Sequence, residues 1–345
     1  MEIKLVTGAC GFVGRHLIKK LRDNSDEHIL MIDDLSTGQD PEKWLNAPFK
    51  VKGKSIKFYG NRLIFIQTDV RDFFLNSESY LNDIFREEPI EFSEIFHLAA
   101  VVGGRLKIEQ DPLAVAIDLS IDAEFFRWVV DQPCKKILYP SSSAAYPIKL
   151  QEKLNHRALK EKDIDLNEIR NPDLTYGWAK LSGEYLAKIA AEKYNKHICC
   201  IRPFSGYGGD QELNYPVPSI VKRFVDREDP LEVWGDGLQS RDFIHINDVI
   251  EGMLIALDTI SDGSAVNLAT GVKTSFMELI KILSEITDHK PVIKPLRNKP
   301  VGVYARYADM SYANDLLNWR PKVDLRSGLR SVYDQVKELS SLEQV

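Results

Sequence analysis

Short apolar runs alternate with stretches of helical periodicity along the first two hundred residues of the chain. The apolar runs predict six strands, at Ile3–Thr7, His28–Asp33, Leu63–Thr68, Glu94–His97, Lys136–Tyr139 and Ile198–Arg202. The helical spacing is clearest at Arg15–Arg22, Leu113–Val130 and Tyr176–Tyr194. Apolar strands separated by amphipathic helices are typical of a parallel sheet covered on both faces. The pattern therefore predicts an α/β fold with a doubly wound parallel sheet.

The pattern changes after Pro203. Glycine and proline become frequent over 206–218 and 235–237, and helical spacing returns at Phe276–Thr287 and Ser327–Glu338. We expect a first domain over 1–205 plus about 241–262, and a smaller α/β domain over 206–240 and 263–345. The basic segment 46–62 is expected to be a surface excursion, with no function assigned to it.

Composition and charge exclude several classes of function. The formal net charge of −6 argues against a general affinity for nucleic acid or for an anionic membrane. No apolar run approaches the roughly 20 residues that span a bilayer, and the chain enters its first strand without a signal sequence. The four cysteines have neither metal-ligand spacing nor a disulfide pattern. We expect a cytoplasmic protein without a metal site.

Three glycines follow the first predicted strand, in the order Gly8-x-x-Gly11-x-x-Gly14. Glycines between a strand and a helix allow a tight turn, a close approach to a pyrophosphate and close helix–sheet packing. Asp33 ends the second strand, nineteen residues after Gly14, where a carboxylate accepts hydrogen bonds from an adenosine ribose and repels a 2′-phosphate. No Arg or Lys follows in the next five residues, Asp34 to Gly38. The spacing therefore predicts NAD, rather than NADP, on a sheet of Rossmann type.

Tyr176 and Lys180 form a second candidate site. At a spacing of four residues, both side chains project from one helix face, and an ammonium favours the phenolate form of a neighbouring tyrosine. Upstream, Ser141-Ser142-Ser143 follows a predicted strand, at the sheet edge where open parallel sheets bind ligands. Together with the glycine loop, this order of motifs indicates an oxidoreductase-type site.

These motifs resemble those of the extended short-chain dehydrogenase/reductases, specifically the NAD-dependent nucleotide-sugar epimerases and dehydratases. The resemblance covers almost the whole chain. Further markers are Thr68-Asp69-Val70, His97-Leu98-Ala99-Ala100, the segment from Arg202 to Gly208, and the segment from Gly235 to Phe243. Val102-Gly103-Gly104, Tyr146-Pro147 and Trp234-Gly235-Asp236-Gly237 look closer to GDP-mannose 3,5-epimerase, while other features are similar to UDP-galactose 4-epimerase.

The resemblance implies a role for each matching residue. Ser142, with Ser143 as the second choice, would act with Tyr176 and Lys180 in catalysis. The residues expected to bind NAD are Gly8, Gly11, Phe12, Val13, Gly14, Asp33, Asp34, Leu35, Ser36, Asp69, Val70, Leu98, Ala99, Ala100, Tyr176, Lys180 and Pro203. The residues expected to bind a nucleotide-diphosphate sugar are Ser142, Ser143, Ser205, Lys222, Trp234, Arg241 and Arg306, with the two arginines on the diphosphate.

Departures from the family pattern narrow the reaction. Dehydratases carry an Asp-Glu pair after the hydroxyl residue, where this chain has Ser143-Ala144. The family's asparagine in the helix after Pro112 is missing, and Asp118 stands nearby. What fits is a 4-epimerase that forms a transient 4-keto sugar on a GDP- or UDP-sugar. The alternatives are a 4-dehydrogenase and, fitting less well, a 4,6-dehydratase or a non-catalytic NAD-binding regulator.

The resemblance also implies assembly. The predicted helices Leu113–Val130 and Tyr176–Tyr194 each carry apolar residues on more than one face. One face must cover the sheet, so the other needs a second partner. We expect a homodimer in which both helices pack against their copies about a two-fold axis.

Overall fold

The structure, a computed structural model, describes residues 1–86, 88–101, 103 and 105–342. A nine-stranded sheet runs through the molecule in the order β15-β10-β7-β6-β1-β2-β5-β4-β3. The first seven of these strands are parallel. In chain order they are β1 (Glu2–Thr7), β2 (His28–Asp33), β5 (Leu63–Gln67), β6 (Glu91–His97), β7 (Cys134–Pro140), β10 (Ile198–Pro203) and β15 (Asp262–Leu268).

The strand order reverses beside β1. The chain adds β2 and β5 on one side of this strand and β6, β7, β10 and β15 on the other. In doubly wound sheets, the crevice at such a reversal point, outside the carboxyl ends of the strands, is where ligands bind. The predicted fold class is therefore confirmed, and the topology places the candidate site at the ends of β1 and β6.

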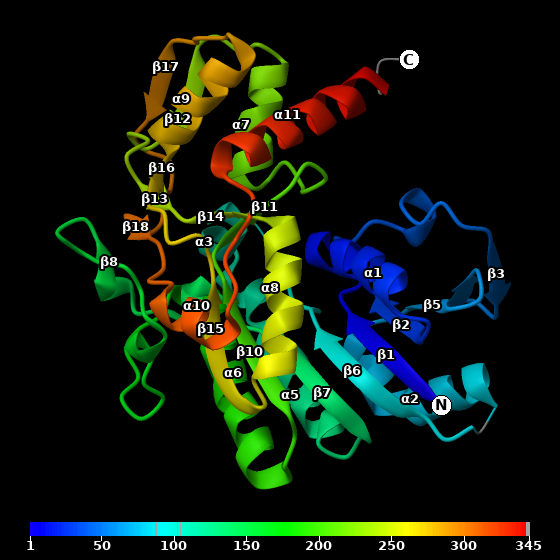
Figure 1. The fold of residues 1–345 in the computed structure, drawn as a ribbon. Helices are drawn as coiled ribbons and strands as arrows, with labels where there is room; N and C mark the ends of the chain where they lie inside the picture. Colours follow the sequence, from blue (N-terminus) through cyan, green and yellow to red (C-terminus); the bar gives the residue numbers. More distant parts are fainter. Residues whose placement is uncertain (87, 102, 104, 343–345) are drawn as a thin grey trace.

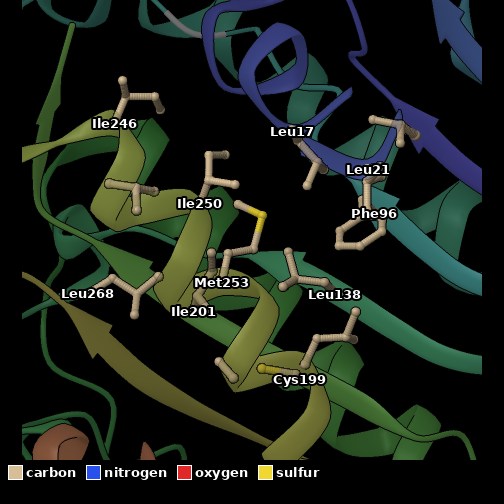
Figure 2. Close-up of a cluster of buried hydrophobic side chains, with 14 of the residues drawn as sticks. Leu17, Leu21, Phe96, Leu138, Cys199, Ile201, Ile246, Ile250, Met253 and Leu268 are labelled. Carbon is tan, nitrogen blue, oxygen red and sulfur yellow. The ribbon is translucent and has the colours of Figure 1, made fainter. Parts of the chain in front are cut away.

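One face of the sheet is covered by α1 (Phe12–Asn24) and α8 (Ile246–Thr259), which pack against each other. Figure 2 shows this interface: Leu17 and Leu21 of α1 and Ile250 and Met253 of α8 lie in one cluster with Leu138 of the sheet. All of these side chains are buried. The core on this face therefore joins the start of the chain to a segment that follows about 230 residues later.

The opposite face is covered by α2 (Val70–Phe85), α5 (Ile117–Val129) and α6 (Leu174–Tyr194). Aromatic side chains dominate this core: Trp128 stacks on Phe74 at a centroid distance of 5.0 Å, and both contact Phe125. Figure 1 shows α2, α5 and α6 side by side beneath the sheet. The doubly wound arrangement follows from these two apolar layers.

The helix predicted over Leu113–Val130 is interrupted, so that prediction is wrong in one respect. The segment contains α4 (Pro112–Val115), which Asp111 caps, and then α5, with Ala116 between them. The amide of Ala116 donates to the carbonyl of Leu113 at 3.1 Å, which tightens the turn at the end of α4.

The apolar faces of α5 also differ from the expectation. Ile121, Phe126 and Trp128 are buried within the chain, since α2 and the sheet cover them. The exposed large hydrophobic side chains of this helix pair are Leu119 on α5 and Leu174, Trp178, Tyr185 and Tyr194 on α6. These side chains are the ones that a second copy could cover, and the homodimer stays a prediction.

Segment 46–62 is part of the sheet, and the expectation of a surface excursion is wrong. It forms β3 (Phe49–Lys52) and β4 (Ile56–Tyr59), an antiparallel hairpin that pairs with β5. Ile56 and Tyr59 are buried, while all four residues of β3 are exposed. The apolar pattern did not predict β3, because lysines alternate along it and an edge strand needs few apolar positions.

The second half of the chain builds a smaller layer above the carboxyl ends of the strands (Figure 1). Here α7 (Pro216–Val225), α9 (Phe276–Thr287) and α11 (Leu325–Leu342) surround the paired strands β12 (Leu231–Trp234) and β17 (Ile293–Leu296). Val221, Phe224, Leu279 and Leu329 belong to its separate hydrophobic core. The boundaries given above for two domains stay a prediction.

Short elements connect the two layers. They are α3 (Arg105–Gln110), α10 (Ser311–Leu317), β8 (Gln151–Glu152), β9 (Asn155–His156), β11 (Ser205–Tyr207), β13 (Ser240–Arg241), β14 (Phe243–His245), β16 (Thr274–Ser275) and β18 (Ala305–Arg306). Single 3-10 turns lie at Pro41–Lys43, Ser143–Ala145, Ile148–Leu150 and Glu161–Asp163. Within the described residues, no helix has the length and apolar character needed to cross a membrane.

Candidate active site

The glycine loop is packed too tightly for any side chain at two of its three positions. Gly8 has a φ of +63°, and a Cβ there would stand 2.7 Å from the amide nitrogen of Ala99. A Cβ on Gly14 would stand 2.4 Å from the carbonyl oxygen of Gly8. At Gly11 the nearest atom to a Cβ is that same oxygen at 3.3 Å, and this residue faces the cavity. The loop is therefore a backbone cradle of the kind that a pyrophosphate occupies.

Asp33 is held rigidly at the end of β2. Its Oδ2 accepts a hydrogen bond from the amide of Cys10 at 2.9 Å, and its Oδ1 accepts one from the amide of Leu35 at 2.8 Å. Burial raises the pKa of this carboxyl, and the two backbone donors partly oppose that shift. Each carboxylate oxygen keeps a further lone pair for a hydroxyl donor. The cradle and this carboxylate together fit the pyrophosphate and adenosine ribose of NAD.

A cavity of about 550 Å³ runs from this loop along the carboxyl ends of the strands. It brings together most residues that the sequence predicted: Gly8, Gly11, Phe12, Val13, Gly14, Asp33, Asp34, Ser36, Asp69, Val70, Leu98, Ala99, Ala100, Ser142, Tyr176, Lys180, Pro203, Ser205, Arg241 and Arg306. Their roles stay predictions, but one surface presents all of them to a ligand.

Four predicted residues do not line this cavity. Leu35 packs into the core beside Asp33, and Ser143 is buried in the turn after Ser142. Lys222 donates to both carboxylate oxygens of Asp226, one turn further along α7. Trp234 lies on β12 with the ammonium of Lys299 5.9 Å from its ring centroid. Of the Val102-Gly103-Gly104 motif, Val102 and Gly104 lie outside the described residues.

Tyr176 and Lys180 stand one turn apart on α6, as their spacing predicted. The Nζ of Lys180 is 6.0 Å from the ring centroid of Tyr176 and 5.2 Å from that of Tyr139. Burial raises the pKa of Tyr176, and the nearby Lys180 and Ser142 lower it. Burial has the larger effect, so the chain's own groups leave the pKa of this phenol above its ordinary value.

Close packing brings the start of α6 against the turn that carries Ser142. A Cβ on Gly177 would stand 2.4 Å from the carbonyl oxygen of Ala144. The amide of Asp173 donates to that same oxygen at 2.9 Å. The hydroxyl of Ser142 accepts from the amide of Ala144 at 3.1 Å, which fixes the serine side chain. Gly177 is thus required for Ser142 and Tyr176 to face the same space.

Two buried carboxylates lie behind Lys180. Burial lowers the pKa of this ammonium, but Asp122, Tyr176 and Asp118 together raise it above its ordinary value. Asp118 is 1% exposed, and burial raises its pKa to about 6. Its Oδ1 accepts from the amide of Val101 at 2.6 Å, whereas its Oδ2 has no hydrogen-bond partner in the described part of the chain. Lys180 therefore stays cationic. Beside it, Asp118 is a buried acid with one carboxylate oxygen that forms no hydrogen bond within the described residues.

Arginines gather at the other end of the cavity. Arg241 on β13 and Arg306 on β18 are register partners in a small sheet. The guanidinium of Arg241 donates to the carbonyl oxygens of Ser240, Val301 and Val303. The fixed guanidinium planes leave a positively charged patch that suits a phosphate group.

Sequence reasoning missed several residues of the cavity wall. Arg71, Arg105, Glu212, Asn214 and Tyr215 all line it. Arg105 had a usable signal, because it is a cation shortly after the carboxyl end of β6, the strand beside the reversal point. Tyr215 had none, because its loop enters the site only through the packing of α7.

The comparisons with known proteins agree with this geometry. The sequence model of the NAD dependent epimerase/dehydratase family matches residues 4–269. A UDP-glucuronate 4-epimerase of Thermodesulfobacterium geofontis is 27% identical over 98% of this chain and 97% of its own.

Two solved structures are similar over the whole chain. The UDP-glucose 4-epimerase of Thermotoga maritima with UDP-glucose has a TM-score of 0.79, at 26% identity over 99% of this chain and 100% of its own. The UDP-glucuronic acid 4-epimerase of Bacillus cereus in complex with UDP-glucuronic acid and NAD has a TM-score of 0.78, at 27% identity over 98% and 100%. The resemblance found in the motifs is confirmed: this chain is an enzyme of the NAD dependent epimerase/dehydratase family, and its cofactor is NAD.

Proposed function

We propose that this enzyme is a 4-epimerase of nucleotide-diphosphate sugars and that its substrate carries UDP. The observation that carries the proposal is the single cavity that joins the glycine loop, the Ser142–Tyr176–Lys180 group and the arginine patch. Ser143 and Ala144 follow Ser142, so the acid and base that eliminating water requires do not stand at that place. Reversible oxidation at one sugar carbon needs only the hydroxyl, phenol and ammonium that are present.

The chain's residues have separate tasks in this reaction. Tyr176, as phenolate, takes the proton of the sugar 4-hydroxyl, and Ser142 hydrogen-bonds the same oxygen. Lys180 favours the phenolate through its charge. NAD, held by the glycine loop and Asp33, would supply the acceptor and donor of the C4 hydride, and the positive charge of its nicotinamide would further favour the phenolate. When the sugar turns over in the cavity, Tyr176 returns its proton to the same oxygen on the inverted carbon.

The substrate end of the cavity supports a nucleotide diphosphate. Arg241 and Arg306 present guanidinium groups whose planar geometry matches phosphate oxygens. UDP is favoured over GDP because the three epimerases compared above bind or are named for UDP-sugars.

A panel of UDP- and GDP-sugars, incubated with the NAD-loaded enzyme and read by chromatography with mass spectrometry, tests the proposal. A product of unchanged mass and new retention time is the expected result for a UDP-sugar. Loss of two hydrogens would instead identify a 4-dehydrogenase, and loss of water a dehydratase. If NAD binds but none of the UDP- or GDP-sugars is converted, the proposed epimerase activity is refuted, and a non-catalytic role in NAD binding is favoured instead.

Assembly and location belong to the same proposal. Leu119, Trp178 and Tyr185 are 42%, 41% and 51% exposed on the outer side of α5 and α6, and they support a homodimer through this helix pair. All four cysteines are free thiols, which supports a reducing compartment such as the cytoplasm.

A further inference from the structure

Asp173 holds two arginines at the boundary between the catalytic residues and the arginine patch. Its two carboxylate oxygens each accept a hydrogen bond from Nη1 of Arg105 at 2.9 Å. Its Oδ2 also accepts one from Nη2 of Arg306 at 2.7 Å. Asp173 is 6% exposed, so both ion pairs are shielded from water. One buried carboxylate thus fixes the positions of two guanidinium groups from distant parts of the chain.

Each of these arginines keeps one terminal nitrogen unused. In Arg105, Nε donates a hydrogen bond to Glu109 and Nη1 donates to Asp173. In Arg306, Nε donates to Gln151 and Nη2 donates to Asp173. The Nη2 of Arg105 and the Nη1 of Arg306 have no hydrogen-bond partner among the described residues. Both side chains line the cavity. These two nitrogens are therefore the donors available to a bound anion.

The charges at this end of the cavity also call for an anion. Arg241 donates hydrogen bonds only to carbonyl oxygens. Burial is the largest cause that lowers the pKa of Arg241, the charge of Arg306 is the next, and the pKa falls to about 9. Arg105 contributes to the same lowering. Asp173 is the one buried carboxylate that pairs with this group of three guanidiniums in the described chain. A second anion among them would relieve their mutual repulsion.

Arg105 belongs to α3, which packs against the helix α6 that carries Tyr176, whereas Arg241 and Arg306 lie on β13 and β18. Asp173 is three residues before Tyr176 and bonds through its amide to the turn of Ser142. The guanidinium of Arg105 also lies flat against Gly302, where a Cβ would stand 3.0 Å from Cζ. Arg105 lines the same cavity as Tyr176 and Arg241, so a ligand that reaches both of these residues can also contact Arg105.

We propose that Arg105 is a third guanidinium ligand of the substrate's diphosphate, and that Asp173 positions it for the phosphate attached to the sugar. The proposal rests on the proposed function, since it assumes a nucleotide-diphosphate sugar. We assign Arg105 to the phosphate that is attached to the sugar, called the outer phosphate below. This phosphate lies nearer the reacting sugar carbon, and hence nearer Tyr176, than the other one does. Arg241 and Arg306 remain for the rest of the diphosphate.

Binding of nucleotides that differ by one phosphate tests this assignment. Calorimetric titration of the NAD-loaded enzyme with UDP and UMP, and with GDP and GMP, gives the dissociation constant of each nucleotide. The difference within each pair is the contribution of the outer phosphate to binding. Arg105→Ala should weaken the diphosphate about tenfold or more and the monophosphate of the same base by less than about threefold. NAD affinity should be unchanged in the variant.

Lys107→Ala is the matched control, because it removes an exposed cation from the same helix α3 without touching Asp173. It should leave all the nucleotide affinities unchanged. If Arg105→Ala does not fold, Arg105→Gln removes the charge but keeps a donor for Asp173, and the same difference is expected.

The outcomes separate this inference from the proposed function. Equal weakening of diphosphate and monophosphate, or unchanged binding of both, would overturn the role of Arg105 while the epimerase proposal stands. If none of the four nucleotides binds the wild-type enzyme, both proposals are wrong. A loss confined to the diphosphates supports the assignment.

Discussion

Replacing Asp118 by asparagine tests the electrostatics behind Lys180. In the folded protein the pKa of this carboxyl is about 6, against an ordinary value of 3.8, because it is buried. When folding raises the pKa of a carboxyl, its contribution to the free energy of unfolding is most favourable at low pH, where it is protonated in both states. For Asp118 this contribution is lost as the pH rises through about 6. With about 1.4 kcal/mol for each pKa unit, the ionised carboxylate costs the fold about 3 kcal/mol at pH 8. The same linkage gives about half of that cost at pH 5.

Asp118→Asn removes this pH-dependent cost. The difference in unfolding free energy between the variant and the wild type should therefore grow in the variant's favour by about 1.4 kcal/mol from pH 5 to pH 8. Any penalty for burying the amide is independent of pH and cancels in this comparison. Urea denaturation at the two pH values measures the difference, with Glu124→Gln on the same helix as the control.

The same variant should move the activity profile. The negative charge of Asp118 raises the pKa of Tyr176, so its removal should extend activity toward lower pH. A stability difference that does not change between pH 5 and pH 8 would refute the reasoning. So would an activity profile that moves toward higher pH.

Three other variants or measurements address the remaining roles. Tyr176→Phe should lower turnover by about a hundredfold to ten-thousandfold while NAD still binds, as fluorescence titration can show; normal turnover would remove the proposed base. Asp33→Ala should weaken NAD about tenfold or more and narrow the preference over NADP, and an unchanged preference would contradict the ribose assignment. Sedimentation at micromolar concentration should show a species of twice 39.3 kDa, whereas a fully active monomer would refute the dimer.

Features that depend on local chemistry were predictable from the sequence. The glycine loop, Asp33 at the end of β2 and the pair Tyr176–Lys180 follow from strand–turn–helix spacing, and the structure brings all of them to one cavity. Their positions are fixed by neighbours within a few residues or by strand ends that must lie at the same sheet edge.

Features that depend on tertiary packing were not predictable in the same way. The position of Lys222 in the chain suits a contact with a diphosphate. In the structure, however, its ammonium donates hydrogen bonds to Asp226, one turn away on the same helix. Arg105 and Asp173 are 68 residues apart, and no local pattern connects them. The hairpin of β3 and β4 gains its order from pairing with β5 rather than from its own apolar content. The break at Ala116 depends on one tightened turn within an otherwise helical pattern.

In the proposed reaction, the enzyme inverts C4 by oxidising and then reducing the same carbon. The most direct test incubates the NAD-loaded enzyme with UDP-glucose and UDP-glucuronate that carry deuterium at C4, and follows the products by nuclear magnetic resonance and mass spectrometry. We predict that at least one of them yields its C4 epimer with the deuterium retained at C4 and no net consumption of NAD. An epimer that has lost the deuterium to solvent, or a released keto sugar, would be incompatible with oxidation and reduction at C4 alone.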